Sequence, residues 1–149
     1  MNTSVFELVK NFSTQNNVIQ QANLHYFTVS KRRVSISINT NKVLNLFLKT
    51  TFDYAIDRAD NRATIIVNSK VNKNDLVLSV KDYGDIPCEE VLSFFNIDYN
   101  IIKNYNRFGA HDSIFINGVK ELFNKSITVT LDKNQYSEIE FHGYFPLQS

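Results

Sequence analysis

The chain has 149 residues, which suits one domain, expected to span 1–149, with a hydrophobic core of its own. Its 16 basic and 15 acidic residues leave a net charge of +1, so charge gives no reason to expect nucleic acid or an anionic membrane as a partner. The single cysteine, Cys88, excludes an internal disulfide and leaves a zinc site short of thiolates, so we expect no bound metal. Since no stretch approaches the ~20 apolar residues of a membrane span, we expect a cytoplasmic protein.

The beginning of the chain is polar and rich in Asn and Gln, which predicts a lead-in segment (1–32) ahead of a core that spans 33–149. Within the lead-in, apolar residues at helical spacing over 5–12 predict one short helix. The apolar cluster over 22–27 fits either a helix or a strand. Alternation of apolar and polar residues over 34–38 then predicts a half-buried strand.

In the middle of the chain, the residue pattern predicts a long helix followed by a hairpin. Residues 41–58 carry apolar side chains at intervals of three and four, which predicts an amphipathic helix capped by Asn39 or Thr40. Two stretches rich in Val and Ile, 63–71 and 76–82, are typical of strands, and the polar turn between them makes a hairpin.

In the last part of the chain, residue spacing predicts a short helix over 86–95, a long loop over 96–109 and a helix over 112–123. A second hairpin follows, with strands over 126–131 and 136–145. Strands and helices mixed in this order favour an α+β fold, a two-layer sandwich whose mixed, mostly antiparallel sheet is covered by helices on one face.

Three local patterns carry a more specific signal. The first is the helix that contains Tyr54. In the second, a strand ends in Asp82 and is followed by Gly84 and then by an Ile-Pro pair that begins at Ile86. The third is Gly109, which lies shortly before a helix. This order and these separations resemble the ATP-binding domain of histidine kinases, within the superfamily of gyrase, heat-shock chaperone, histidine kinase and mismatch-repair ATPases.

The resemblance implies that the adenine end of a nucleotide pocket is partly kept. Asp82 matches the carboxylate that accepts a hydrogen bond from the adenine amino group, and Gly84 and Ile86 match the turn behind it. The second glycine of the family's motif is deleted here. An ordinary β-turn with Asp and Gly at turn positions remains the alternative interpretation of this segment.

The resemblance implies that the phosphate end is mostly lost. Tyr54 stands where the family has an asparagine that coordinates Mg²⁺ and the triphosphate, and a phenol is a poor ligand for that ion. A shift of one place in the alignment would bring Asp53 to this position instead. Of the glycines that wrap the phosphates only Gly109 remains, or Gly118 in another register, and Asp112 adds a negative charge there.

We therefore expect a catalytically degenerate, histidine-kinase-like domain, a pseudokinase with no catalytic residue and no cofactor. The resemblance implies a role as a protein-recognition or scaffold module in bacterial two-component signalling, with a response regulator or a kinase bound through residues 96–120. The loop within that range either packs into the vacated cleft or stays exposed for the partner. Three alternatives stay open: a kinase domain of the histidine kinase or anti-sigma type that binds ATP with Mg²⁺ through an unorthodox phosphate site, a structural or homodimerising domain, and a fragment of a larger chain.

Overall fold

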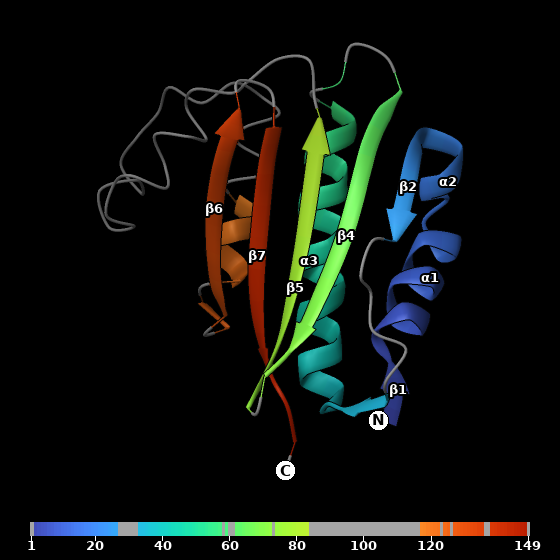
Figure 1. Ribbon diagram of the computed structural model, residues 1–149. Helices are drawn as coiled ribbons and strands as arrows, with labels where there is room; N and C mark the ends of the chain where they lie inside the picture. The colour runs from blue at the N-terminus through green and yellow to red at the C-terminus, as the bar shows by residue number, and fades with distance from the viewer. Residues whose placement is uncertain are drawn as a thin grey trace.

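The computed structural model describes residues 2–26, 33–57, 59, 62–72, 74–83, 117–122, 124–125, 127–135 and 138–148. These residues form two layers, a five-stranded sheet and a group of helices (Figure 1). The short helix expected over 86–95 and the loop expected over 96–109 lie outside the described residues.

Most of the expected elements occur near the expected positions. In chain order they are β1 (Asn2–Ser4), α1 (Val5–Gln15), α2 (Val18–Gln21), β2 (Ala22–Tyr26), β3 (Arg33–Ser35), α3 (Ile38–Asp57), β4 (Ala63–Val71), β5 (Asp75–Tyr83), a helix over 117–122, β6 (Thr128–Gln135) and β7 (Glu138–Pro146). Both predicted hairpins are confirmed, and the undecided cluster after residue 21 is a strand. None of the helices in the described parts of the chain is long and apolar enough to cross a membrane.

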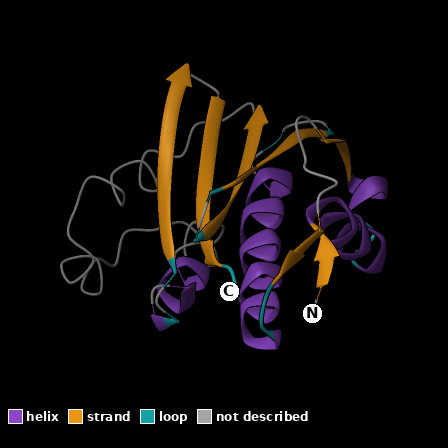
Figure 2. Cartoon of the chain, turned by 60° about the horizontal axis from the view of Figure 1, so that its bottom comes forward, coloured by secondary structure: helices purple, strands orange, loops and turns teal. Residues whose placement is uncertain are grey.

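The five strands lie in the order β2-β4-β5-β7-β6, and every neighbouring pair is antiparallel except β2 and β4. A parallel pair needs a crossover connection, which here contains α3. A second, two-stranded sheet pairs β1 with β3. α3 and the helix over 117–122 lie against one face of the large sheet, with α1 beside α3 (Figure 2). The expected α+β two-layer fold is confirmed.

Aromatic contacts show which face of the sheet meets the helices. Phe47 of α3 packs edge-on against Phe145 of β7, with 5.5 Å between the ring centroids. Phe145 lies opposite Leu76 of β5, and alternate residues of a strand point to the same face. The helix-facing residues of β5 are therefore Leu76, Leu78, Val80 and Asp82, and all four are buried.

The hydrophobic core includes residues from the first 32 positions as well. Val5 and Val9 of α1 are fully buried, and the Phe12 ring meets Phe52 of α3 edge-on at 5.7 Å. The start of β2 is held by Arg62, whose guanidinium donates to the carbonyl oxygen of Gln20 at 2.8 Å, that of Ala22 at 3.1 Å and the Asn23 side chain at 2.9 Å. The lead-in thus packs as part of the same body.

The beginning of α3 differs from the expectation. The strand predicted over 34–38 ends at Ser35, and α3 begins at Ile38, before Asn39 and Thr40. The cap is Ser37, whose side-chain oxygen accepts the Thr40 N–H at 2.9 Å and whose carbonyl oxygen accepts the Asn41 N–H at 3.0 Å. The prediction of Asn39 or Thr40 as the cap was wrong because Ser37 already supplies the acceptor that a helix start needs.

Candidate functional site

Asp82 is an acidic residue on the face of the large sheet that the helices cover. It lies near the end of β5, between Ile65 of β4 and Ile139 of β7, and its exposure is 1%. An ionised carboxylate is costly to bury beside apolar side chains, so a fold seldom keeps one there without a use for it. The end of β5 is therefore the first candidate for a functional position.

Tyr54 comes from α3 into the same part of the interlayer space. Its exposure is 3%, and its ring packs edge-on against Phe141 of β7, with 5.9 Å between the centroids. Phe141 lies two residues from Ile139, the residue opposite Asp82, and points to the same face. Asp82 and Tyr54, both expected site residues, thus lie near each other in one buried patch between the sheet and α3.

Asp53 lies on the outer surface of α3. Its carboxylate forms an ion pair of 2.9 Å with Lys49, one turn earlier, and the two side chains are 48% and 64% exposed. Successive helix residues point about 100° apart, so Asp53 and the buried Tyr54 cannot serve the same position. The geometry gives no support to a shift of one place that would put Asp53 in the site.

The other expected site residues, Gly84, Ile86 and Gly109, lie outside the described residues, as does most of the expected partner surface over 96–120. Of that surface the structure describes residues 117–120, which belong to the helix over 117–122. Within the described residues, no group of three or more His, Cys, Asp and Glu side chains is placed to hold a metal ion.

The known proteins that this chain resembles are found among solved structures. No protein-family model and no curated protein matches the sequence. The nucleotide-free catalytic domain of the histidine kinase ThkA is similar at a TM-score of 0.67 and 13% identity, over 98% of this chain and 94% of that one. The mycobacterial sensor histidine kinase MprB is similar at 0.63 and 15% identity, over 99% of each chain.

The chain has the fold of a histidine kinase catalytic domain. A further match is ThkA in complex with the response regulator protein TrrA, at a TM-score of 0.61 and 14% identity, over 99% of this chain and 42% of that one. At such identities the shared property is the histidine kinase fold itself. The fold that the three sequence patterns predicted is confirmed.

Gly118 allows a close approach between two helices of this fold. A Cβ atom at this position would lie 2.6 Å from Oγ1 and 2.8 Å from Cγ2 of Thr50, a residue of α3. Neither distance is a tolerable contact, so a side chain at residue 118 would force the Thr50 side chain or the helix over 117–122 to shift. The structure therefore gives Gly118 a packing role. Thr50 was missed by the sequence analysis, because no local pattern marks its contact with residue 118.

We expect Gly118→Ala to destabilise the fold by up to about 2 kcal/mol. Overpacking costs roughly 1–3 kcal/mol, and the gain in helix propensity on replacing Gly offsets about 1 kcal/mol of it. Urea unfolding of Gly118→Ala, Thr50→Ala and the double variant measures the coupling. Thr50→Ala removes both clashing atoms, so the double variant should lose less than the sum of the two single losses. Additive losses would contradict this contact.

A polar network on the opposite face of the sheet was also missed. Ser79 Oγ lies 2.8 Å from His142 Nδ1, and His142 Nε2 lies 3.3 Å from Glu140 Oε1. The order of hydroxyl, imidazole and carboxylate is that of a nucleophile with its base. However, the main-chain N–H groups around Ser79 belong to antiparallel ladders with β4 and β7, and so cannot stabilise an oxyanion. We interpret this network as cross-strand stabilisation.

Proposed function

We propose that this chain is a catalytically degenerate, histidine-kinase-like domain, a cytoplasmic pseudokinase that recognises other signalling proteins. The observation that carries the proposal is the position of Tyr54. The phenol of Tyr54 stands where the resemblance places the Mg²⁺-coordinating amide. Its ring is buried against Phe141, which lies two residues along β7 from the residue opposite Asp82. A buried ring fills space that a triphosphate and its ion would need, and a phenol does not replace the lost oxygen ligand.

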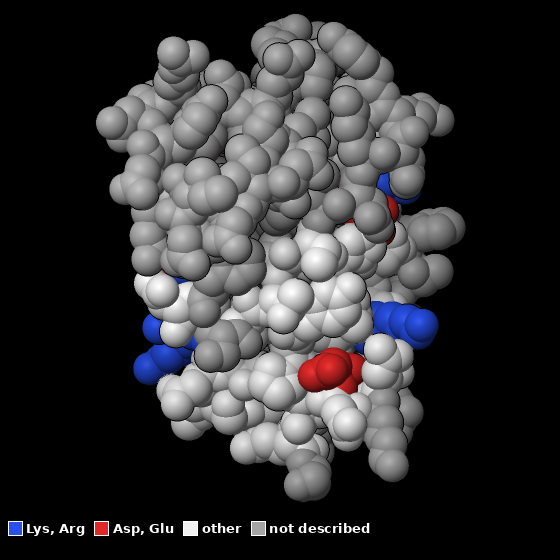
Figure 3. All heavy atoms as spheres, turned by 90° about the vertical axis from the view of Figure 1, so that its left-hand side faces the viewer, with Lys and Arg blue, Asp and Glu red and all other residues white. Residues whose placement is uncertain are grey.

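The proposed partner is a response regulator or a kinase of a bacterial two-component pathway, bound through residues 96–120. ThkA, which has this fold within a longer chain, has been solved with the response regulator protein TrrA, and this supports the class of partner. Figure 3 views the molecule from the side of β6 and shows both acidic and basic side chains on the described part of that face. Such a mixed surface suits a protein partner better than a polyanion.

One observation favours a second function, a kinase domain that binds ATP with a rebuilt phosphate site. Asp82 is kept at the end of β5, on the helix-facing side, at 1% exposure. The resemblance places an adenine-binding carboxylate at this position. Nucleotide binding separates the two functions.

We expect ATP with Mg²⁺ at ~1 mM to leave the melting temperature of the protein unchanged. A ligand present at ~100 times its Kd would add roughly 2.7 kcal/mol, which for a domain of this size is a rise of about 5–10 °C. The measurement is a thermal shift with ATP, with and without EDTA. Adenosine serves as the control, because it tests the Asp82 end of the pocket alone. A Mg²⁺-dependent rise would refute the pseudokinase and establish the second function.

A further inference from the structure

One edge of the large sheet is covered by a short segment, α2 with β2, which we call the strap (residues 18–26). β2 has the outermost place in the sheet and pairs with residues 63–67 of β4 (Figure 1). That part of β4 is mostly apolar, whereas residues 68–71 beyond it are mostly polar and include Lys70. An apolar strand edge invites pairing with another chain, and a lysine discourages it. The strap thus covers the part of the β4 edge that most needs a cover.

Arg62, directly before β4, holds the strap by polar contacts. Its guanidinium donates to the carbonyl oxygens of Ile19, of Gln20 at 2.8 Å and of Ala22 at 3.1 Å, and to Oδ1 of Asn23 at 2.9 Å. The last carbonyl groups of a helix have no partner within the helix, and here the guanidinium supplies donors for α2. All four acceptors belong to the strap, so one exposed side chain joins the strap to the beginning of β4.

The strap buries few side chains. Val18 and Ala22 are its buried residues, at 3% and 1% exposure, whereas Ile19 is 60% exposed. The Tyr26 ring is half-buried and meets the Phe6 ring of α1, with 4.9 Å between the centroids. The neighbouring α1 contributes four apolar side chains to the core, Val5, Leu8, Val9 and Phe12. Because segments with few buried contacts open at a lower free energy than the whole fold, the strap can open while α1 stays in place.

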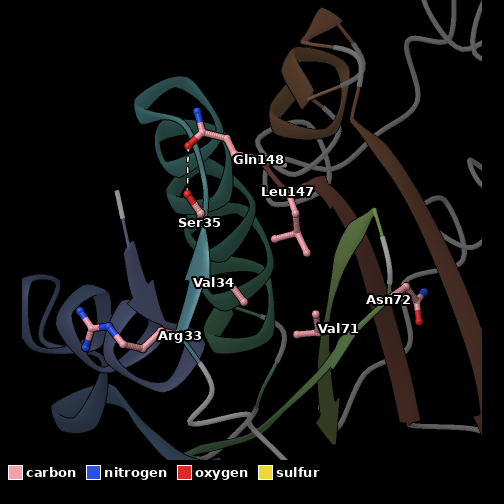
Figure 4. Close-up of a pocket in the computed structure, with 7 residues that line it drawn as sticks. All are labelled: Arg33, Val34, Ser35, Val71, Asn72, Leu147 and Gln148. Atoms are coloured by element: carbon pink, nitrogen blue, oxygen red, sulfur yellow. Dashed lines mark hydrogen bonds between the residues drawn. The ribbon is translucent and has the colours of Figure 1, made fainter.

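The elements on both sides of the strap are anchored. Before it, Asn17 joins α1 to α2 with a left-handed backbone, at a φ of 54°, which asparagine tolerates better than most residues. After it, β3 pairs with β1. The Ser35 carbonyl oxygen of β3 accepts the Gln148 N–H at 2.8 Å, and the Ser35 hydroxyl donates to Gln148 Oε1 at 3.2 Å (Figure 4). The strap therefore lies between two fixed elements, with a tight turn at its beginning.

We propose that the strap opens and closes over the apolar part of the β4 edge, with Arg62 as its latch and Asn17 as its hinge. In the closed state β2 completes the five-stranded sheet. In the open state the guanidinium loses its four acceptors and β4 becomes an edge strand, while α1 and β3 keep their places. The device controls whether an apolar strand edge is accessible. It is independent of the proposed function, because none of these residues belongs to the candidate site at the end of β5.

The test is the rate at which a buried thiol reacts with DTNB. Cys88, the single cysteine of the chain, is replaced by serine so that one reporter remains. Ala22→Cys places the reporter in the strap, at a position of 1% exposure, and Ala55→Cys places the control in α3, at 0%. Arg62→Gln should speed the reaction at residue 22 about tenfold, because losing a hydrogen bond to a charged donor shifts an equilibrium by about that factor. The rate at residue 55 should stay unchanged.

Two results would overturn the proposal. Equal acceleration at residues 22 and 55 would mean that Arg62 stabilises the whole fold and latches no separate segment. An unchanged rate at residue 22 would mean that the hydrogen bonds of Arg62 do not hold the strap closed. Arg62→Lys keeps the positive charge but lacks the planar fork of donors, so its rate at residue 22 should lie closer to that of Arg62→Gln than to that of the unaltered side chain. Urea unfolding checks that each variant is folded before its rate is measured.

Discussion

Replacing Tyr54 by alanine is expected to lower the free energy of unfolding by about 3–5 kcal/mol, the usual range for removing a large buried aromatic side chain. The reason is the position of the ring, which is 3% exposed and packed edge-on against Phe141. Tyr54→Phe keeps the ring and removes only the hydroxyl, so its loss should stay below about 1.5 kcal/mol. Urea unfolding, with the slope of the transition compared between variants, measures both losses.

Tyr83 provides the matched control for Tyr54. It is 41% exposed at the end of β5, where the Lys81 ammonium lies 5.6 Å from its ring centroid. Tyr83→Ala should therefore lose no more than about 1 kcal/mol. Equal losses for Tyr54→Ala and Tyr83→Ala would mean that Tyr54 does not fill the interlayer space. The observation that carries the pseudokinase proposal would then be removed.

Replacing Asp82 by asparagine is expected to destabilise the protein by about 1.5–3 kcal/mol, the range for hydrogen bonds that involve a charged group. We expect this because Asp82 lies at 1% exposure on the helix-facing side of the sheet, where we expect hydrogen bonds to hold its carboxylate as a structural group. Unfolding in urea gives the stability, and a titration with adenosine gives the binding.

The two measurements on Asp82→Asn distinguish the two functions. If its stability matches that of the unaltered chain while adenosine binding is lost, the residue has kept a nucleotide-binding role and our expectation is wrong. Asp53→Asn is the control, since the Asp53 side chain is 48% exposed and forms its ion pair with Lys49 on the outside of α3. That change should cost about 0.3–0.5 kcal/mol, the contribution of an exposed pair one helical turn apart.

The sequence predicted the elements whose patterns are long and regular. α3 and the strands β4 and β5 carry enough apolar residues at a fixed spacing to separate the helical from the extended interpretation. The apolar cluster after residue 21 was too short to separate the helical from the extended interpretation. Its place beside β4 is decided by tertiary pairing. The alternation over 34–38 suggested a strand that continues to residue 38. The strand ends earlier, because Ser37 caps the beginning of α3.

Local motifs could mark candidate site residues, whereas contacts that join residues far apart in the sequence were not predicted. The pattern after β5 marked Asp82, and its alignment with α3 marked Tyr54. By contrast, Ser79 and His142 are 63 residues apart in sequence, and Ser35 and Gln148 are 113 apart. Pairing at that range depends on strand register and sheet order, which no local spacing encodes.

The place of β2 at the edge of the large sheet has a consequence for the order in which the protein opens. In the described sheet β2 is hydrogen-bonded to β4 alone, whereas β5 is paired with both β4 and β7. Elements held by fewer contacts open first. β2 should thus separate from the sheet before its central strands do. Amide hydrogens of β2 would then exchange with solvent faster than those of β5, at the centre of the sheet.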